Sequence, residues 1–213
     1  MSLAVRADLA ESHRRSLAHV AASGAHFAGE QRLRIAAVAR DAYLAPEPSP
    51  PWVRPFGELA LDVAYRLARH AGTITEQWYE QIITEGMRPL EWVEVVGIVI
   101  ATVPVVAFSR AAGLPLPGLP SPQSGAPHGR VAAELSPATL NWVPVAAPAD
   151  RTASVVQALS AVPDEWENLW QLAAAQYMSD SQMADPRWNR GTLSRPQIEL
   201  AAGRISRIRE CFF

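Results

Sequence analysis

The stretch Val95–Phe108, VVGIVIATVPVVAF, decides the fold, because it is the longest apolar run in the chain. A helix needs roughly 20 apolar residues to cross a bilayer, and this run is shorter. Charged Glu94 and Arg110 flank it, and Pro104 lies inside it. We therefore predict a buried core helix over residues 90–112 rather than a membrane span.

Apolar residues recur at helical spacing on both sides of this stretch, which predicts an all-α fold. No strand-like alternation of any length is present. The predicted helices are a first one that ends near residue 23, then 30–43, 56–71, 76–85, 90–112, 152–161, 163–178 and 195–209. Residues 180–190 are expected to form a polar loop.

Two short patterns predict where helices begin. Thr73 and Glu76 have the spacing of a capping box, in which each side chain bonds the other's backbone amide. Ser194 and Gln197 have the same spacing, and Pro196 between them suits a first helical turn. We expect one helix to start at each box.

A Pro-rich segment divides the sequence into two helical halves. Proline fixes φ and lacks a backbone donor, so regular structure is not expected there. The predicted organisation is an N-terminal helical half over 1–113, a Pro-rich connector over 114–150 and a C-terminal helical half over 151–213. Trp142 and Val143 are expected to pin the connector, or strap, to the surface.

The composition is that of an ordinary globular protein and excludes several function classes. Of the 213 residues, 49% are hydrophobic and 19% charged, and the net charge is −2. This balance argues against nucleic-acid binding through a basic face. One cysteine excludes an internal disulfide framework and a cysteine-based zinc site. The N-terminus has no apolar signal-peptide core, so we expect a cytoplasmic protein without a membrane segment.

Two acidic residues and the cysteine are the candidates for chemistry. Glu199 and Glu94 each precede an apolar helical run, and both have an alternative role in complementing the helix dipole. Asp164 and Glu165 suit the N-terminal end of their own helix for the same reason. Cys211 is either a reactive thiol or a small buried hydrophobe.

The remaining residues do not predict a metal or cofactor site. No histidine pair has a recognisable ligand spacing, and no dinucleotide-binding, phosphate-binding or serine-hydrolase motif is present. The histidines considered are His13, His19, His26, His70 and His128. We therefore expect no metal and no cofactor.

At Glu199 and Cys211 the sequence resembles the AhpD-like alkylhydroperoxidase family, which includes carboxymuconolactone decarboxylases. The resemblance is carried by LSRPQIEL at 193–200 and RISRIRECFF at 204–213. In that family a glutamate opens a helix, and twelve residues later comes the first cysteine of a Cys-x-x-Cys motif, with a histidine after it. Further stretches resemble the longer, two-repeat members: Ala22–Phe27, Glu94–Gly97, Ala112–Leu116 and Trp142–Pro144. Trp92–Gly97 and Gln197–Ala202 would then be equivalent parts of two related halves.

The resemblance implies an AhpD-like fold of two related helical halves and a peroxidase mechanism. A second thiolate attacks the hydroperoxide, and the glutamate and histidine relay the proton. The first cysteine then resolves the sulfenic acid as a disulfide, which a dithiol reductant reopens. In these terms Glu199 is the relay carboxylate and Cys211 the resolving thiol. The resemblance also implies a homo-oligomer, with a dimer favoured.

The sequence departs from the family pattern after Cys211. The second redox position and the histidine have no counterpart up to Phe213, and Val106 occupies the equivalent place in the first half. We expect the chain as it stands to be inactive, and the intact gene product to be the enzyme. One hypothesis is that the codon after Phe213 is a UGA that encodes selenocysteine; the alternatives are a nonsense truncation and an artificially chosen chain end. A non-catalytic interaction protein of the same fold and a lactone-decarboxylating lyase are the alternative functions.

Overall fold

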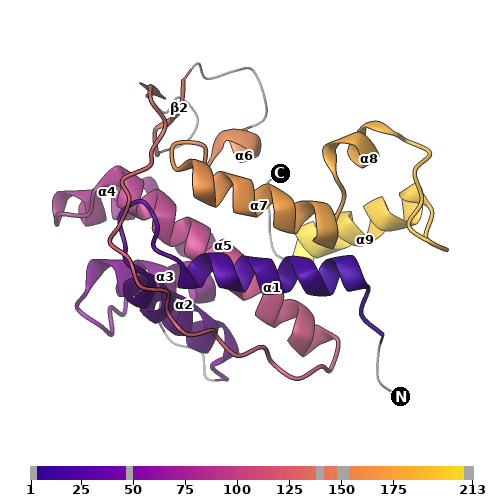
Figure 1. Ribbon diagram of the computed structural model, residues 1–213, viewed down its shortest axis with the longest axis horizontal. Coiled ribbons are helices and arrows are strands. Elements are labelled where there is room, and N and C mark those ends of the chain that lie inside the picture. The colour runs from indigo at the N-terminus through magenta and orange to yellow at the C-terminus, as the bar shows by residue number, and fades with distance from the viewer. Residues whose placement is uncertain (1–3, 47–49, 138–141, 148–153, 209–213) are drawn as a thin grey trace. The chain divides into compact units, whose positions relative to one another are not determined.

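The computed structural model describes residues 4–46, 50–137, 142–147 and 154–208. Regular structure in these ranges is almost entirely helical, which confirms the all-α class (Figure 1). The helices are α1 (Ala7–Ala21), α2 (Gly29–Leu44), α3 (Leu59–His70), the 3₁₀ turn η1 (Ala71–Thr73), α4 (Glu76–Thr84), α5 (Pro89–Ala111), α6 (Ser154–Gln157), α7 (Pro163–Gln176), α8 (Asp180–Ala184) and α9 (Arg195–Ile208).

The chain forms two compact units. Unit 1 is Met1–Leu172 and unit 2 is Ala173–Phe213, so the boundary falls inside α7. The Pro-rich connector belongs to unit 1. The predicted relation between two repeated halves stays a prediction.

The apolar stretch Val95–Phe108 lies in α5, which is the core helix of unit 1. By length and composition α5 could cross a membrane, but 67% of its most apolar 18-residue window is buried within the protein. Its buried side chains pack with those of α1, α2, α3 and α4 in one hydrophobic cluster. The prediction of a core helix is therefore confirmed. Gly113 follows it with a φ of +65°, a left-handed conformation that suits a helix end.

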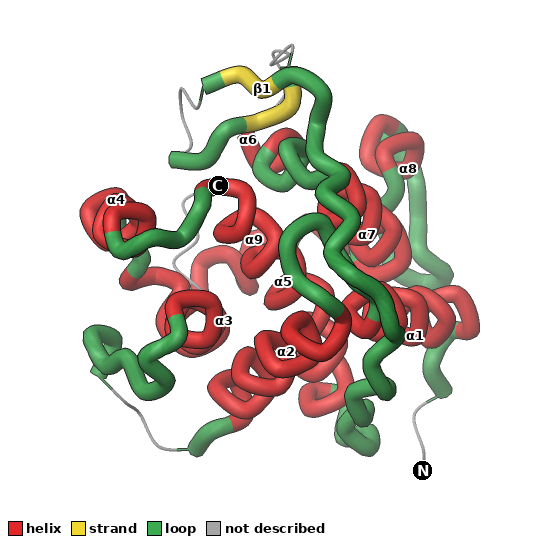
Figure 2. Tube along the Cα trace, turned by 60° about the vertical axis from the view of Figure 1, so that its left-hand side comes forward, coloured by secondary structure: helices red, strands yellow, loops and turns green. Residues whose placement is uncertain are grey.

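Small side chains let the central helices of unit 1 approach closely. Ala36 and Ala39 of α2, Ala64 of α3 and Ala101 of α5 are all fully buried. Residue contacts join α2 to α3, α2 to α5 and α3 to α5. The three helices lie side by side in Figure 2. This packing places α2 where its buried face can present a side chain to α5.

The start of α4 differs from the predicted capping box. The helix begins at Glu76, and its cap is Thr75, whose hydroxyl accepts a hydrogen bond from the backbone of Trp78. Thr73 lies in the preceding 3₁₀ turn, and its hydroxyl donates to the carbonyl of His70 at 2.7 Å. The predicted pairing of Thr73 with Glu76 is wrong because Thr75, one residue before Glu76, competes for the same helix end.

α9 begins directly after Ser194, as predicted, and half of the second predicted box is seen there. The side-chain oxygen of Gln197 accepts from the backbone N–H of Ser194 at 2.9 Å. The Ser194 hydroxyl donates to the same oxygen at 3.0 Å. The predicted loop at 180–190 is interrupted, however, by α8. Ser179 and Gln182 form a capping box there, which was not predicted. A polar composition alone did not distinguish this short helix from a loop.

The Pro-rich connector follows the surface of unit 1 and is held by backbone hydrogen bonds. Gln123 N–H donates to the carbonyl of Ala21 at 2.9 Å, and His128 N–H donates to that of Gly24 at 3.0 Å. These bonds fix the loop between α1 and α2 from outside. Regular structure was not expected in the connector, but it includes a two-residue antiparallel pair of strands, β1 (Leu135–Ser136) and β2 (Val145–Ala146).

Trp142 and Val143 pin the connector to unit 1, as predicted. The Trp142 ring lies 6.2 Å from the ring of Tyr79 on α4. Val143 is partly buried and packs against the apolar core.

Candidate functional site

Glu199 is exposed on α9 and is held by two neighbours within unit 2. Its Oε1 lies 2.6 Å from Nε of Arg195, and the hydroxyl of Tyr177 lies 3.0 Å from its Oε2. The hydrogen bond from Arg195, followed by that from Tyr177, lowers the pKa of the Glu199 carboxyl below its ordinary value. Glu199 is therefore an oriented, ionised carboxylate at neutral pH.

The helix-dipole explanation does not fit Glu199 or Glu94. The helices begin at Arg195 and Pro89, so neither glutamate lies in a first helical turn. The other candidate, Cys211, lies outside the described residues. Of the two residues predicted to be catalytic, only Glu199 lies in the described part of the chain, so only its surroundings are given.

Unit 1 contains a set of charged side chains whose contact with one another was not predicted from the sequence. The exposed fractions of Arg32, Glu94 and Glu165 are 0%, 0% and 1%. Nη1 of Arg32 lies 2.5 Å from Oε1 of Glu94 and 2.7 Å from Oε1 of Glu165. Nε2 of His19 lies 3.0 Å from Oε2 of Glu165 and 2.9 Å from Nη2 of Arg32. We call these four residues the buried charge cluster.

The backbone around the buried charge cluster binds one carboxylate and leaves room for both at two glycines. The N–H of His26 donates to Oε2 of Glu94 at 2.6 Å. A Cβ atom at Gly24 would overlap the Glu94 carboxylate, and a Cβ atom at Gly97 would overlap the side chain of Glu165. Both positions therefore require glycine for close approach. Buried charges persist in proteins only when they are paired and hydrogen-bonded in this way.

The two carboxylates of the cluster have opposite pKa shifts. Burial raises the pKa of Glu94 above its ordinary value, and Arg32 offsets only part of this effect. Burial acts in the same direction on Glu165, but Arg32 and the hydrogen bond with His19 outweigh it and lower the pKa of Glu165. Of the two, the carboxylate that faces His19 is thus the one that ionises more readily.

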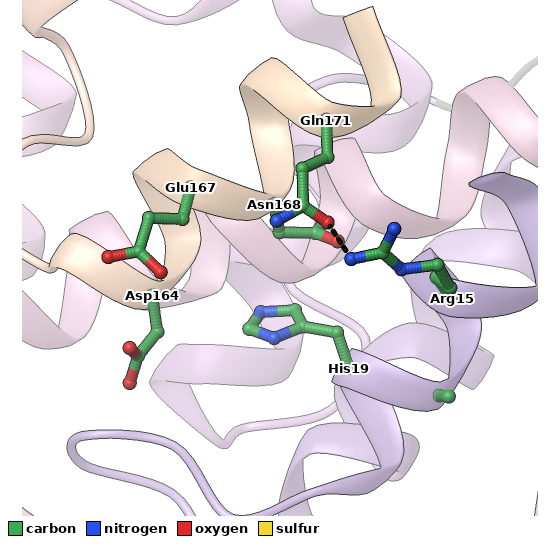
Figure 3. A pocket seen from close by; sticks show the side chains of 7 residues that line it. Arg15, His19, Asp164, Glu167, Asn168 and Gln171 are labelled. Atoms are coloured by element: carbon green, nitrogen blue, oxygen red, sulfur yellow. Dashed lines mark hydrogen bonds between the residues drawn. The ribbon is translucent and has the colours of Figure 1, made fainter. Parts of the chain in front are cut away.

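His19 connects the buried charge cluster to the surface. Its side chain is 21% exposed and lines a pocket of about 290 Å³ (Figure 3). The pocket is formed by side chains of α1 and α7, namely Arg15, Ala18, His19, Asp164, Glu167, Asn168 and Gln171. An imidazole backed by a buried carboxylate can exchange a proton with a molecule in such a pocket.

Within the described ranges, no group of three or more His, Cys, Asp or Glu side chains is placed to hold a metal ion. The pocket is polar, and its chemistry is that of proton exchange and charge recognition by side chains.

A pattern in the sequence indicates the buried charge cluster, although the site prediction did not include it. Arg32 falls on the buried face of α2 with Ile35 and Ala39, at the spacing of an apolar stripe. Glu165 shares its buried face with Leu172 in α7. A charged residue inside an apolar stripe indicates a buried ionic partner. The partner itself could not be deduced, because the sequence does not show which helices meet.

The arginines nearest to Glu94 in sequence are Arg88 and Arg110, but Arg88 pairs with Glu91. Glu94 instead pairs with Arg32, which is 62 positions away.

No protein-family model, curated protein or solved structure matches this chain. The resemblance to the AhpD-like family therefore rests on the residues quoted for it.

Proposed function

We propose that this chain is an AhpD-like, peroxidase-related protein in which Glu199 relays a proton and Cys211 is the resolving thiol. The observation that carries the proposal is the state of Glu199. Arg195 and Tyr177 hold it as an oriented carboxylate, and the one cysteine of the chain follows twelve residues later. A proton relay needs a fixed carboxylate of this kind.

The proposed reaction reduces a small hydroperoxide to an alcohol. In the family pattern, a thiolate or selenolate three positions after the resolving cysteine attacks the terminal peroxide oxygen, and the O–O bond breaks. The alcohol leaves with a proton delivered through the Glu199 relay. Cys211 then displaces water from the oxidised centre and forms a disulfide or selenenyl sulfide, and a dithiol reductant restores both groups.

The test compares this chain with the chain continued through the codons that follow Phe213 in the gene. With cumene hydroperoxide and dithiothreitol, we expect sustained turnover from the continued chain only. In this chain Cys211 should still be alkylated by iodoacetamide. Sustained turnover by this chain that Cys211→Ser abolishes would show that the roles are misassigned.

Variants of the continued chain separate the relay from a structural role. Glu199→Gln should lower turnover by about 10²–10⁴-fold, which is the usual contribution of a positioned acid–base group. The matched control is Glu80→Gln, because Glu80 is exposed on α4 in unit 1. If the continued chain consumes no hydroperoxide, the proposal fails.

A second candidate function is that of a non-catalytic protein that self-associates through α9. Its Leu200, Ile205 and Ile208 are 75%, 62% and 65% exposed. Apolar residues gathered on one element at this exposure favour a partner, and a second copy of the chain is the partner we propose. Light scattering should then show a dimer that Leu200→Glu dissociates and Ser206→Glu does not. A dimer without hydroperoxide turnover in the continued chain would favour this function over the first.

A further inference from the structure

We propose that the pocket over His19 is a second, separate site, which binds a small carboxylate-bearing molecule at Arg15 and exchanges a proton with it through His19. The proposal rests on the placement of a cation, an imidazole and a buried carboxylate along one pocket. It uses no residue of the Glu199 site.

The size and lining of the pocket suit a small polar molecule. Its volume of about 290 Å³ is near the lower end of the range for small-molecule sites, which is roughly 300–1,000 Å³. The lining comes from α1 and from the part of α7 that belongs to unit 1, and side-chain hydrogen bonds join the two helices. Asn168 at its base is itself fixed, because its Nδ2 donates to the hydroxyl of Ser16 at 3.2 Å.

The charged side chains that line the pocket differ in whether another protein group already pairs with them. Arg130 forms ion pairs with both Asp164 and Glu167, and Asp164 also lies 3.2 Å from Nε2 of His128. Arg130 therefore carries one positive charge against these two carboxylates and holds both of them. They form the acidic end of the pocket, and a carboxylate ligand would bind at the opposite end.

Arg15 forms the opposite end of the pocket. In Figure 3 it lies on the other side of the His19 ring from Asp164 and Glu167. Its Nη2 donates to the side-chain oxygen of Gln171 at 2.8 Å. Among the described residues it has no ion pair of its own, since the nearby Glu11 is paired with Arg14. A guanidinium bound only to a neutral amide at a pocket wall is suited to a carboxylate ligand.

His19 supplies the proton-exchanging group between these two ends. Its Nε2 is engaged with the buried Glu165, which fixes the orientation of the ring. Its Nδ1 makes no hydrogen bond within the described part of the chain. When Nδ1 takes a proton from the ligand, Glu165 meets the new positive charge. Glu165 is the carboxylate of the cluster with the lowered pKa, so it is ionised at neutral pH and can meet that charge. Nη2 of Arg32 lies 2.9 Å from Nε2 of the ring and also helps to fix the ring.

The ligand class that fits is a small dicarboxylic acid. One carboxylate would bind Arg15, and the second carboxyl group would reach Nδ1 of His19. The proton passes from the ligand to the ring and returns by the same path, so the step needs no oxidant or reductant.

The experiment follows the imidazole nitrogens of the full chain by NMR with ¹⁵N-labelled histidine, with His19 assigned by through-bond correlation. The probes are malate and succinate, and their neutral amides serve as ligand controls. We expect both acids to shift the His19 nitrogens saturably, with a dissociation constant of about millimolar, as is usual for a ligand of this size. The amides should leave His19 unshifted.

Two variants locate the carboxylate contact. Arg15→Gln should weaken binding by about tenfold or more, which is the loss of one charge-assisted contact. Arg14→Gln is the matched control, because Arg14 is the adjacent arginine and does not line the pocket. Both replaced side chains point away from the apolar core, so both variants should fold.

The protonation readout separates an acid–base role from simple binding. At a fixed pH, bound malate should move the His19 nitrogen signals toward those of a protonated ring, and Glu165→Asp should alter that change while binding persists. The proposal is overturned if neither acid shifts His19, if the amides shift it equally, or if Arg15→Gln and Arg14→Gln behave alike. None of these outcomes depends on peroxidase activity, so this proposal and the proposed function can fail separately.

Discussion

Arg32 is the residue on which the charge balance of unit 1 depends. It is fully buried, and it pairs with both Glu94 and Glu165. Removing one partner of a buried ion pair leaves the other charge in a medium that solvates it poorly. The loss is therefore larger than the net contribution of the pair itself.

We expect Arg32→Met to lower the free energy of unfolding by about 3–5 kcal/mol, because two buried carboxylates lose their cation. The control is Arg34→Met on the same helix, where the side chain is 55% exposed and pairs with Glu58 at the surface. That change should cost less than about 1 kcal/mol. Urea denaturation followed by circular dichroism measures both, and equal losses would contradict the assignment.

The glycine that borders Glu94 gives a second test at this scale. Gly24→Ala places a methyl group where the carboxylate lies, and we expect a loss of about 1–3 kcal/mol from the forced rearrangement. Gly72→Ala is the control, because a Cβ atom there meets nothing within 4 Å. Thermal unfolding of the two variants should differ clearly in midpoint. A stable Gly24→Ala variant would mean that the cluster can move.

At the scale of elements, the N-terminal cap of α4 is the hydroxyl of Thr75. Thr75→Ala should destabilise the protein by about 1 kcal/mol, because it removes the acceptor for the backbone N–H of Trp78. Thr84→Ala, at the exposed other end of the same helix, should have little effect. Denaturant midpoints of the two variants check this, and a larger effect at Thr84 would contradict the observed start of the helix.

The helices were predictable because most of them bury one periodic face, and that periodicity is written in the local sequence. α1 shows it plainly, since Leu9, His13, Leu17 and Val20 are buried at helical spacing. The helix over 89–111 was predictable instead from its long apolar run, with Pro89 at the start and Gly113 just past the end. The exact cap of α4 was not predictable, because Thr73 and Thr75 compete for the same role. The cluster was not predictable either, since its ion pairs depend on which helices meet in space.

At the scale of the whole molecule, acid stability follows from the two buried glutamates. The folded pKa of Glu165 is lowered, so its contribution is complete above the ordinary value of about 4.3 and is lost as the pH falls through the folded value. Glu94 has the opposite sign. Its folded pKa is raised, so the stability it contributes is present below the ordinary value and is lost as the pH rises through the raised one.

We therefore expect the stability gap between the wild type and Glu165→Gln to narrow as the pH falls below about 4.3. Urea midpoints measured across the acid range give this gap directly. Glu80→Gln, on the exposed face of α4, should keep a constant gap at every pH. An unchanged gap for Glu165→Gln would place the acid-sensitive group elsewhere.

The spacing of the cluster along the chain also sets an order of events on the ribosome. Glu94 is 62 positions from Arg32, whereas Glu165 is 133 positions from it. Because synthesis runs from the N-terminus at about 5–20 residues per second, α5 emerges several seconds before α7. The nascent chain therefore meets first a balanced pair of Arg32 and Glu94. Glu165, the second carboxylate, joins the cluster only after α7 has been synthesised. The contact between His19 and Glu165 is therefore formed last.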